Sequence, residues 1–224
     1  FFNFLAKVKF FFPSGIMNKE NLKKFWNKFW FIVWKDDSLK GWIISIIFIF
    51  IIIKFIFFPL LSLATGTALP LAIVESCSMY HQGNLLSNFN EWWQSHEDNY
   101  NKLSIGETDF EDFIFKKGFN KGDILFIAGT KPENVKIGDV IIFNAGSKNP
   151  IIHRVVKIKE SENGLTFSTM GANVGQIQFF EQEIKENQLV GKAVFKLAPY
   201  LGWVKLVFYE PSRSSSEKGF CSGN

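Results

Sequence analysis

Residues 41–63 read GWIISIIFIFIIIKFIFFPLLSL and contain one charged side chain, that of Lys54. As a helix this stretch would be roughly 34 Å long at ~1.5 Å per residue, enough to cross a hydrocarbon core of about 30 Å. A buried helix of a soluble protein would show a polar face, and this stretch has none. Lys54 would cost about 2.5–3.5 kcal/mol at mid-helix, which does not prevent insertion. We therefore predict a transmembrane helix over 41–63, ended or kinked near its far end by Pro59.

Lysine is distributed unevenly on the two sides of this helix. Residues 1–40 hold eight lysines against three acidic residues, whereas no lysine occurs between Lys54 and Lys102. Because positive charge is retained on the cytoplasmic side, we expect the N-terminus in the cytoplasm and residues 64–224 outside the cell membrane. A cleavable secretory signal is the alternative, but the apolar run is too long and begins forty residues into the chain. The sequence favours an uncleaved, single-pass anchor.

Aromatic residues are unusually frequent before the anchor. The chain has 27 Phe and 7 Trp, and this excess gathers near the N-terminus, which a lipid environment explains better than an aromatic core. Residues 22–34 mix Trp, Phe and Lys as an interfacial helix would, although simple padding beside the membrane has the same composition. We expect 1–40 to be a cytoplasmic basic or interfacial segment, with both readings of 22–34 open.

Residues 84–118 form a polar and aromatic block in the outer part of the chain. The positions of Trp92, Trp93, Tyr100 and Phe110–Phe115 fit a helix or two better than alternating strands. We expect this block to be an insertion that caps the domain around it.

From residue 119 onward, short apolar runs alternate with turns rich in Gly, Asn and Ser. Such runs, recurring every dozen residues without helical periodicity, predict antiparallel strands. The fold class is therefore mainly β: an anchored β-rich domain over 64–209 with a small, partly helical insertion at 84–118. The strand candidates are 122–127, 138–143, 151–158, 165–170 and 189–197.

The end of the chain gives weaker signals. Residues 198–209 are too short and broken for a second span, so they either lie on the bilayer or pack on the domain. Residues 210–224 are rich in Ser, Gly and Lys and are expected to form a flexible tail. Of the two cysteines, Cys77 lies between serines and Cys221 lies in this tail, so we do not expect them to pair.

Charge and histidine content exclude two classes of function. The part beyond the anchor is close to neutral, which gives no electrostatic case for nucleic-acid binding. The chain has three histidines, His81, His96 and His153, and no Cys/His cluster with metal-ligand spacing. We predict no metal and no cofactor.

Two separated segments carry the residues suited to acyl transfer. Residues 74–81 read VESCSMYH, about a dozen residues after the anchor, and IIHRVV at 151–156 supplies an imidazole in a strand-like run. A serine hydroxyl is a poor nucleophile until a base removes its proton. Alone, Ser78 would be an ordinary surface residue and His153 a half-buried ring. Together, beside a membrane, they indicate a Ser–His pair.

These features resemble the type I signal peptidases, the membrane serine proteases that remove signal peptides from exported preproteins. Ser76–Met79 is similar to the Ser-Gly-Ser-Met box, whose second serine is the family's nucleophile. Residues 138–143 resemble the family's structural strand, and 152–155 resemble the box that carries the base. A histidine there is typical of the archaeal and endoplasmic-reticulum branch, and 199–205 is similar to the archaeal C-terminal segment. The resemblance covers about residues 40–209, without the insertion.

The resemblance implies a serine endopeptidase in which Ser78 is the nucleophile and His153 the general base. It further implies an oxyanion hole formed by the Ser78 backbone N–H and the Ser76 hydroxyl, although Ser76 could equally be a plain turn residue. The expected partners are signal peptides of secretory preproteins and the lipid bilayer, with a protein-export channel as a further candidate. Only 14 residues, 64–77, separate the anchor from Ser78. Their reach of at most about 46–50 Å keeps the nucleophile near substrates presented at the membrane surface.

Two departures from the family pattern bear on activity. Cys77 replaces the usual glycine, which is tolerable if its φ is negative. In 169–173 the family's aspartate is replaced by Ala172 or deleted, and that acid normally orients the imidazole. Either a Ser–His dyad suffices or another carboxylate substitutes, and the sequence does not choose among the nearest three: Asp139, which we interpret as a turn residue, Glu181 and Glu183. A catalytically inactive membrane-anchored adaptor and a different membrane-tethered hydrolase remain the alternative functions.

Overall fold

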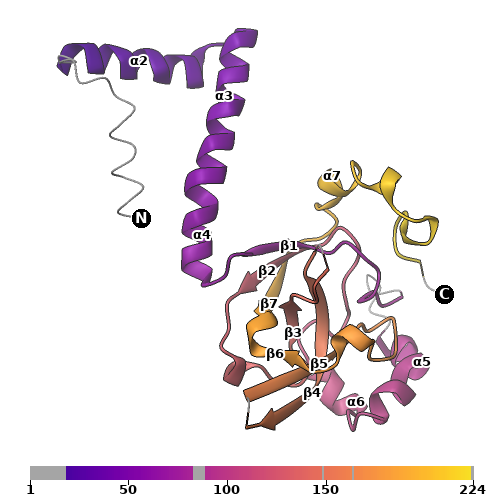
Figure 1. The fold of residues 1–224 in the computed structure, drawn as a ribbon. Coiled ribbons are helices and arrows are strands. Elements are labelled where there is room, and N and C mark those ends of the chain that lie inside the picture. The colour runs from indigo at the N-terminus through magenta and orange to yellow at the C-terminus, as the bar shows by residue number, and fades with distance from the viewer. Residues whose placement is uncertain (1–18, 83–88, 148, 163, 223–224) are drawn as a thin grey trace. The chain divides into compact units, whose positions relative to one another are not determined.

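The computed structural model describes residues 19–82, 89–147, 149–162 and 164–222 (Figure 1). The chain divides into two compact units, 1–59 and 60–224. Parts of three predicted segments lie outside the described residues. These parts are 1–18 of the basic segment, 84–88 of the insertion and 223–224 of the tail.

The first unit contains two helices that pack at a tight corner. Helix α2 (Lys19–Lys35) is followed by α3 (Leu39–Ile52), and the Ser38 side chain caps α3 by accepting a hydrogen bond from the Gly41 N–H. The Ser45 hydroxyl donates to the Val33 carbonyl, 2.7 Å away, which joins the two helices. The predicted 22–34 segment is therefore helical. Its position relative to a membrane stays a prediction.

The apolar helix runs from Leu39 to Thr65 and is long and apolar enough to cross a membrane. Of the two effects expected of Pro59, ending the helix is excluded, and a kink stays a prediction. A π-helical turn (Ile53–Phe57) precedes the proline, and α4 (Phe58–Thr65) continues beyond it. Because proline clashes with the carbonyl four residues earlier, the wider π turn makes room for the ring.

The second unit is built on a curled, fully antiparallel sheet of seven strands in the order β1-β2-β7-β3-β4-β5-β6 (Figure 1). The prediction of a β-rich fold behind an N-terminal apolar helix is confirmed, and all five predicted runs form strands. The sequence missed β1 and β6 because they have only three and two residues. The strands are β1 (Leu71–Ile73), β2 (Ile124–Ala128), β3 (Val140–Phe143), β4 (Ile151–Ser161), β5 (Gly164–Met170), β6 (Ile184–Lys185) and β7 (Leu189–Ala198).

The two Gly-Asp pairs form equivalent turns before β2 and β3. Gly122 and Gly138 adopt φ of +92° and +93°, a region that favours glycine. In each turn the following aspartate accepts a hydrogen bond of 2.9 Å from the backbone N–H three residues earlier. Asp139 is therefore a turn residue, as interpreted from the sequence, and it also pairs with Lys192 at 3.0 Å.

The insertion contains helices α5 (Phe89–Asn101) and α6 (Glu107–Glu111), as predicted. Its large aromatic residues Trp92, Trp93, Tyr100 and Phe110 are buried in the core cluster shared with the sheet. The fully buried Arg154 of β4 ties the insertion to the sheet by donating to the carbonyls of Ile114, Phe115 and Gly138. Loss of hydration lowers the pKa of this guanidinium to about 10, so it stays charged at neutral pH.

The end of the chain belongs to the second unit and packs on its sheet domain. The short helix α7 (Trp203–Leu206) buries Leu206 completely, and the Trp203 indole N–H donates to the Lys121 carbonyl at 2.9 Å. Residues 198–209 thus pack on the domain, and whether the exposed side chains of this segment, such as Val204 and Phe208, also lie on the bilayer stays a prediction. The expectation that the cysteines do not pair is wrong, because Cys77 and Cys221 form a disulfide. Where a flexible tail was expected, residues 210–222 fold back toward the loop that follows β1.

Candidate active site

Ser78 lies in the loop that follows β1, and backbone bonds hold this loop from both ends. Before the serine, the Val74 N–H donates to the Asp123 carbonyl at 2.9 Å. At the serine itself, the Asn173 N–H donates to the Ser78 carbonyl at 2.8 Å. Immediately after it, Met79 is buried in the core. The hydroxyl is therefore presented by a fixed loop.

His153 reaches Ser78 from the middle of the sheet. It lies on β4, where it is directly opposite Ile141 of β3, and its side chain is almost fully buried. Its Nε2 is 2.7 Å from Ser78 Oγ. The structure thus brings together the two residues that the sequence predicted as a pair, although they are 75 positions apart.

A buried carboxylate occupies the other side of the imidazole. Glu181 Oε1 is within hydrogen-bonding distance of His153 Nδ1, and Glu181 has no exposed surface. When Nδ1–H donates to this carboxylate, Nε2 is left as the acceptor that a serine hydroxyl requires. Ser78, His153 and Glu181 therefore form a continuous hydrogen-bonded chain.

Glu181 is itself fixed by two further donors. It ends a short 3-10 helix (Phe179–Glu181) between β5 and β6. The Thr169 hydroxyl donates to Oε1 at 3.1 Å, and the Gln178 N–H donates to Oε2 at 3.0 Å. Because both oxygens are used, the carboxylate has a defined orientation toward the ring.

The structure answers the question of the missing aspartate. Ala172 is buried, and its N–H donates to the Met79 sulfur at 3.4 Å. Glu183 is exposed and lies 3.8 Å from Lys159. Of the three candidate acids, Glu181 alone contacts the histidine. Its proximity to the 169–173 segment was the sequence signal available, but 28 residues separate it from His153, and the two phenylalanines before it are exposed.

Ser76 lies beside the nucleophile candidate, with the two hydroxyl oxygens 3.1 Å apart. Cys77, between them, is not among the non-glycine residues with positive φ in the described chain. The backbone here does not need the glycine that the related motif carries, which explains why cysteine fits.

A cleft of about 430 Å³ opens next to the Ser–His pair. Its walls are largely apolar, and a polar end is formed by Glu75, Asn149, Lys205 and Arg213. Apolar walls beside a few polar groups are typical of a ligand site. The apolar lining includes Leu69, Leu71, Ile73, Ile142, Ile151 and Ile152.

The other two histidines lie outside this site. His81 is buried and stacked on Trp92 with ring centroids 3.6 Å apart, and His96 contacts the Trp92 carbonyl from α5. Burial, together with the nearby Arg154 charge, lowers the pKa of His81 to about 2. Among the residues that the structure describes, no group of three or more His, Cys, Asp or Glu side chains could hold a metal ion.

The fold and site define a β-rich domain with a Ser–His–carboxylate chain beside an apolar cleft. In the chain this domain follows a helix that is long and apolar enough to cross a membrane. No protein-family model matches the chain. It is 30% identical over 96 residues to signal peptidase complex catalytic subunit SEC11C of Homo sapiens, which covers 40% of this chain and 50% of the relative. It is 32% identical over 91 residues to the putative catalytic subunit SEC11B of Homo sapiens, covering 38% of this chain and 54% of the relative.

A fungal relative gives the same result. The signal peptidase complex catalytic subunit sec11 of Schizosaccharomyces pombe is 30% identical over 112 residues, covering 39% of this chain and 59% of the relative. The chain spans about half the length of the curated relatives it matches. The predicted resemblance is confirmed: its homologues are catalytic subunits of the endoplasmic-reticulum type of signal peptidase. These names, with the apolar helix, support a membrane-bound peptidase.

Proposed function

We propose that this chain is a membrane-bound serine endopeptidase that cleaves signal peptides from exported preproteins. The observation that carries the proposal is the hydrogen-bonded chain from Ser78 through His153 to Glu181, beside the apolar cleft. The relatives, which are named as catalytic subunits, favour a catalytic over an accessory role.

In the proposed reaction, Ser78 Oγ attacks the scissile carbonyl while its proton passes to His153 Nε2. The Ser78 N–H and the Ser76 hydroxyl stabilise the resulting oxyanion. The intermediate collapses to an acyl-enzyme as His153 gives the proton to the leaving amine. Water, deprotonated by the same imidazole, then releases the cleaved peptide. Glu181 orients the ring and stabilises its protonated form.

The chain's topology supports a site outside the cytoplasm. Disulfides form and persist in oxidising compartments, and the Cys77–Cys221 bond lies beside the proposed nucleophile. The lysine-rich N-terminal flank favours the same orientation. Only residues 66–77 separate the apolar helix from Ser78, so the site stays near substrates held at the membrane surface. We therefore propose signal peptides of preproteins as substrates, with the bilayer and an export channel as partners.

Two alternatives remain to be tested against this function. The inactive adaptor was motivated by the missing aspartate, and the contact of Glu181 with His153 weakens that motive. A different membrane-tethered hydrolase would use the same Ser–His pair on substrates that are not preproteins.

The test is preprotein cleavage by the full chain in liposomes, with Ser78→Ala as the variant and Ser161→Ala, at an exposed strand end, as the matched control. We expect Ser78→Ala to lose at least about 1,000-fold in rate and Ser161→Ala to stay within twofold. Unchanged cleavage by Ser78→Ala would refute the mechanism. An inactive wild type would favour the adaptor, and hydrolysis of soluble peptides alone would favour the other hydrolase.

A further inference from the structure

The C-terminal strap, defined as residues 200–222, is attached to the loop that carries Ser78. Cys221 forms a disulfide with Cys77, the residue directly before the serine. The Cys77 carbonyl also accepts hydrogen bonds from the Tyr80 N–H at 3.1 Å and from Asn173 Nδ2 at 3.2 Å. The strap is therefore covalently bonded to a residue whose backbone sets the position of the nucleophile.

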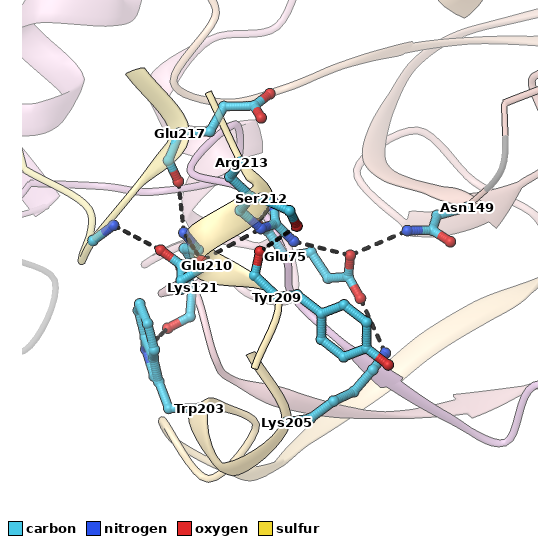
Figure 2. Close-up of polar contacts among 11 residues, drawn as sticks. Glu75, Lys121, Asn149, Trp203, Lys205, Tyr209, Glu210, Ser212, Arg213 and Glu217 are labelled. Carbon is cyan, nitrogen blue, oxygen red and sulfur yellow. Dashed lines mark hydrogen bonds and ion pairs between the residues drawn. The ribbon is translucent and has the colours of Figure 1, made fainter. Parts of the chain in front are cut away.

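A second attachment is made two residues earlier, at Glu75. Arg213 donates from Nη1 to the Glu75 carbonyl at 3.0 Å and from Nη2 to its carboxylate at 3.1 Å. Lys205 and Asn149 also contact that carboxylate, at 3.2 and 3.1 Å (Figure 2). Because Arg213 holds both the main chain and the side chain of Glu75, it restrains the direction of the loop.

The strap is anchored in the body of the domain independently of the cleft. Lys121, which is 1% exposed, pairs with Glu210 at 2.7 Å and donates to the Glu217 carbonyl at 2.6 Å (Figure 2). The hydrogen bond from Lys121 lowers the pKa of Glu210 below its usual range, which keeps this carboxylate ionised. The Trp203 and Phe220 rings lie 4.5 Å apart and pack the two ends of the strap together. A strap held this firmly can restrain the loop to which it is bonded.

The attached and the reactive residues alternate along the loop. Glu75 and Cys77 are bonded to the strap, whereas Ser76 and Ser78 present their hydroxyls to each other beside the cleft. We propose that the strap is a positioning device for Ser78, with the Cys77–Cys221 disulfide as its covalent fastener and Cys77, Cys221 and Arg213 as positioning residues. This inference rests on the proposed peptidase function. If the disulfide positions Ser78, a thiol reductant should slow the reaction, even though none of the proposed catalytic residues is a cysteine.

The chemistry of release is simple. A dithiol such as dithiothreitol transfers two electrons and two protons to the disulfide, giving the Cys77 and Cys221 thiols, while the reagent closes to its own cyclic disulfide. The loop then keeps its hydrogen bonds but loses the covalent restraint. A displacement of about 1 Å at a reacting group can cost about 100-fold in rate, so even small loosening of Ser78 has a measurable effect.

The test is single-turnover cleavage of a preprotein in liposomes, with the full chain in excess. The amplitude reports the fraction of intact sites, the limiting rate constant reports the chemistry, and the half-saturating concentration reports binding. The variants are Cys221→Ser and Glu210→Gln, which weakens the anchor away from the cleft. The control is Lys159→Met, which removes an exposed ion pair on β4.

We expect Cys221→Ser to lower the limiting rate constant at least tenfold and Glu210→Gln to lower it severalfold. The half-saturating concentration should stay within twofold of the wild-type value in both variants. Lys159→Met should match the wild type in amplitude, rate constant and half-saturating concentration. The limiting rate constant of the reduced wild type should fall to that of Cys221→Ser and recover on reoxidation. This measurement tests the inference even if the Cys221→Ser protein fails to fold. A loss of amplitude at an unchanged rate constant, in both the variant and the reduced wild type, would overturn the inference. It would show that the disulfide stabilises the folded domain without positioning Ser78. A wild type without cleavage would instead overturn the peptidase function and this inference with it.

Discussion

The Glu181→Gln substitution tests whether the buried carboxylate contributes to catalysis beyond holding the ring. The side chain keeps its length, and an amide oxygen can still accept from His153 Nδ1, but the negative charge is lost. A unit charge about 4 Å from the protonated ring is worth about 4 kcal/mol at an effective dielectric constant of about 20. That energy is available only once the imidazole has taken the Ser78 proton. We therefore expect the cleavage rate to fall about 1,000-fold with little change in KM.

The assay is preprotein cleavage in liposomes, measured over a range of substrate concentrations to separate kcat from KM. Glu183→Gln is the matched control, because Glu183 is a neighbouring but exposed glutamate. Thr169→Val is a graded control, because it removes one donor to Glu181 and leaves the charge. It should cost about 10- to 100-fold, less than the loss of the charge itself, because a hydrogen bond to a charged group is worth about 1.5–3 kcal/mol. A folded Glu181→Gln protein that retains more than a tenth of wild-type kcat, or a Glu183→Gln protein with an equal loss, would refute the reasoning.

Two further predictions follow from contacts around the site. Gly171→Ala would place a Cβ 2.9 Å from the Ser78 carbonyl oxygen and 3.0 Å from His153 Nε2, so we expect about a 100-fold lower cleavage rate. A Gly171→Ala protein with the wild-type rate would contradict this, because it would show that the loop moves to accommodate the methyl group without loss of catalysis. His81, whose pKa falls from 6.5 to about 2 on burial, stays neutral in the folded chain and takes a proton on unfolding. Stability should therefore decrease as the pH falls below about 6.5, by roughly 1 kcal/mol per pH unit. Unfolding of the detergent-solubilised chain between pH 7 and 5 measures this slope. His81→Phe, which can still stack on Trp92, should flatten it, and an unchanged slope would contradict the assignment.

Most of the fold could be predicted because it is encoded locally. An apolar run of more than about 18 residues specifies a helix by its length and composition, and the Gly-Asp turns before β2 and β3 depend on residues within four positions. The failures were equally local. β6, with two residues, has no periodicity to detect, and the effect of Pro59 was overestimated because a π turn can absorb the ring.

The candidate site was only partly predictable. Ser78 and His153 were identifiable because each sits in a recognisable short motif, whereas Glu181 sits in none. Its position depends on the pairing of β5 with β4, in which Met170 at the end of β5 lies opposite Arg154, so the turn after β5 begins beside His153 at the start of β4. Sequence distance is a poor guide to such contacts, since an antiparallel sheet brings residues together according to register.

By itself, the sequence predicted an apolar helix long enough to span a membrane, a β-rich domain and a Ser–His pair, because hydrophobic pattern and short motifs are properties of neighbouring residues. Only the tertiary structure decided that Glu181 supports His153 and that Cys77 meets Cys221 across 144 residues. The packing of the whole domain places the buried carboxylate against the imidazole and brings the two cysteines within bonding distance. No local pattern in the chain records that packing.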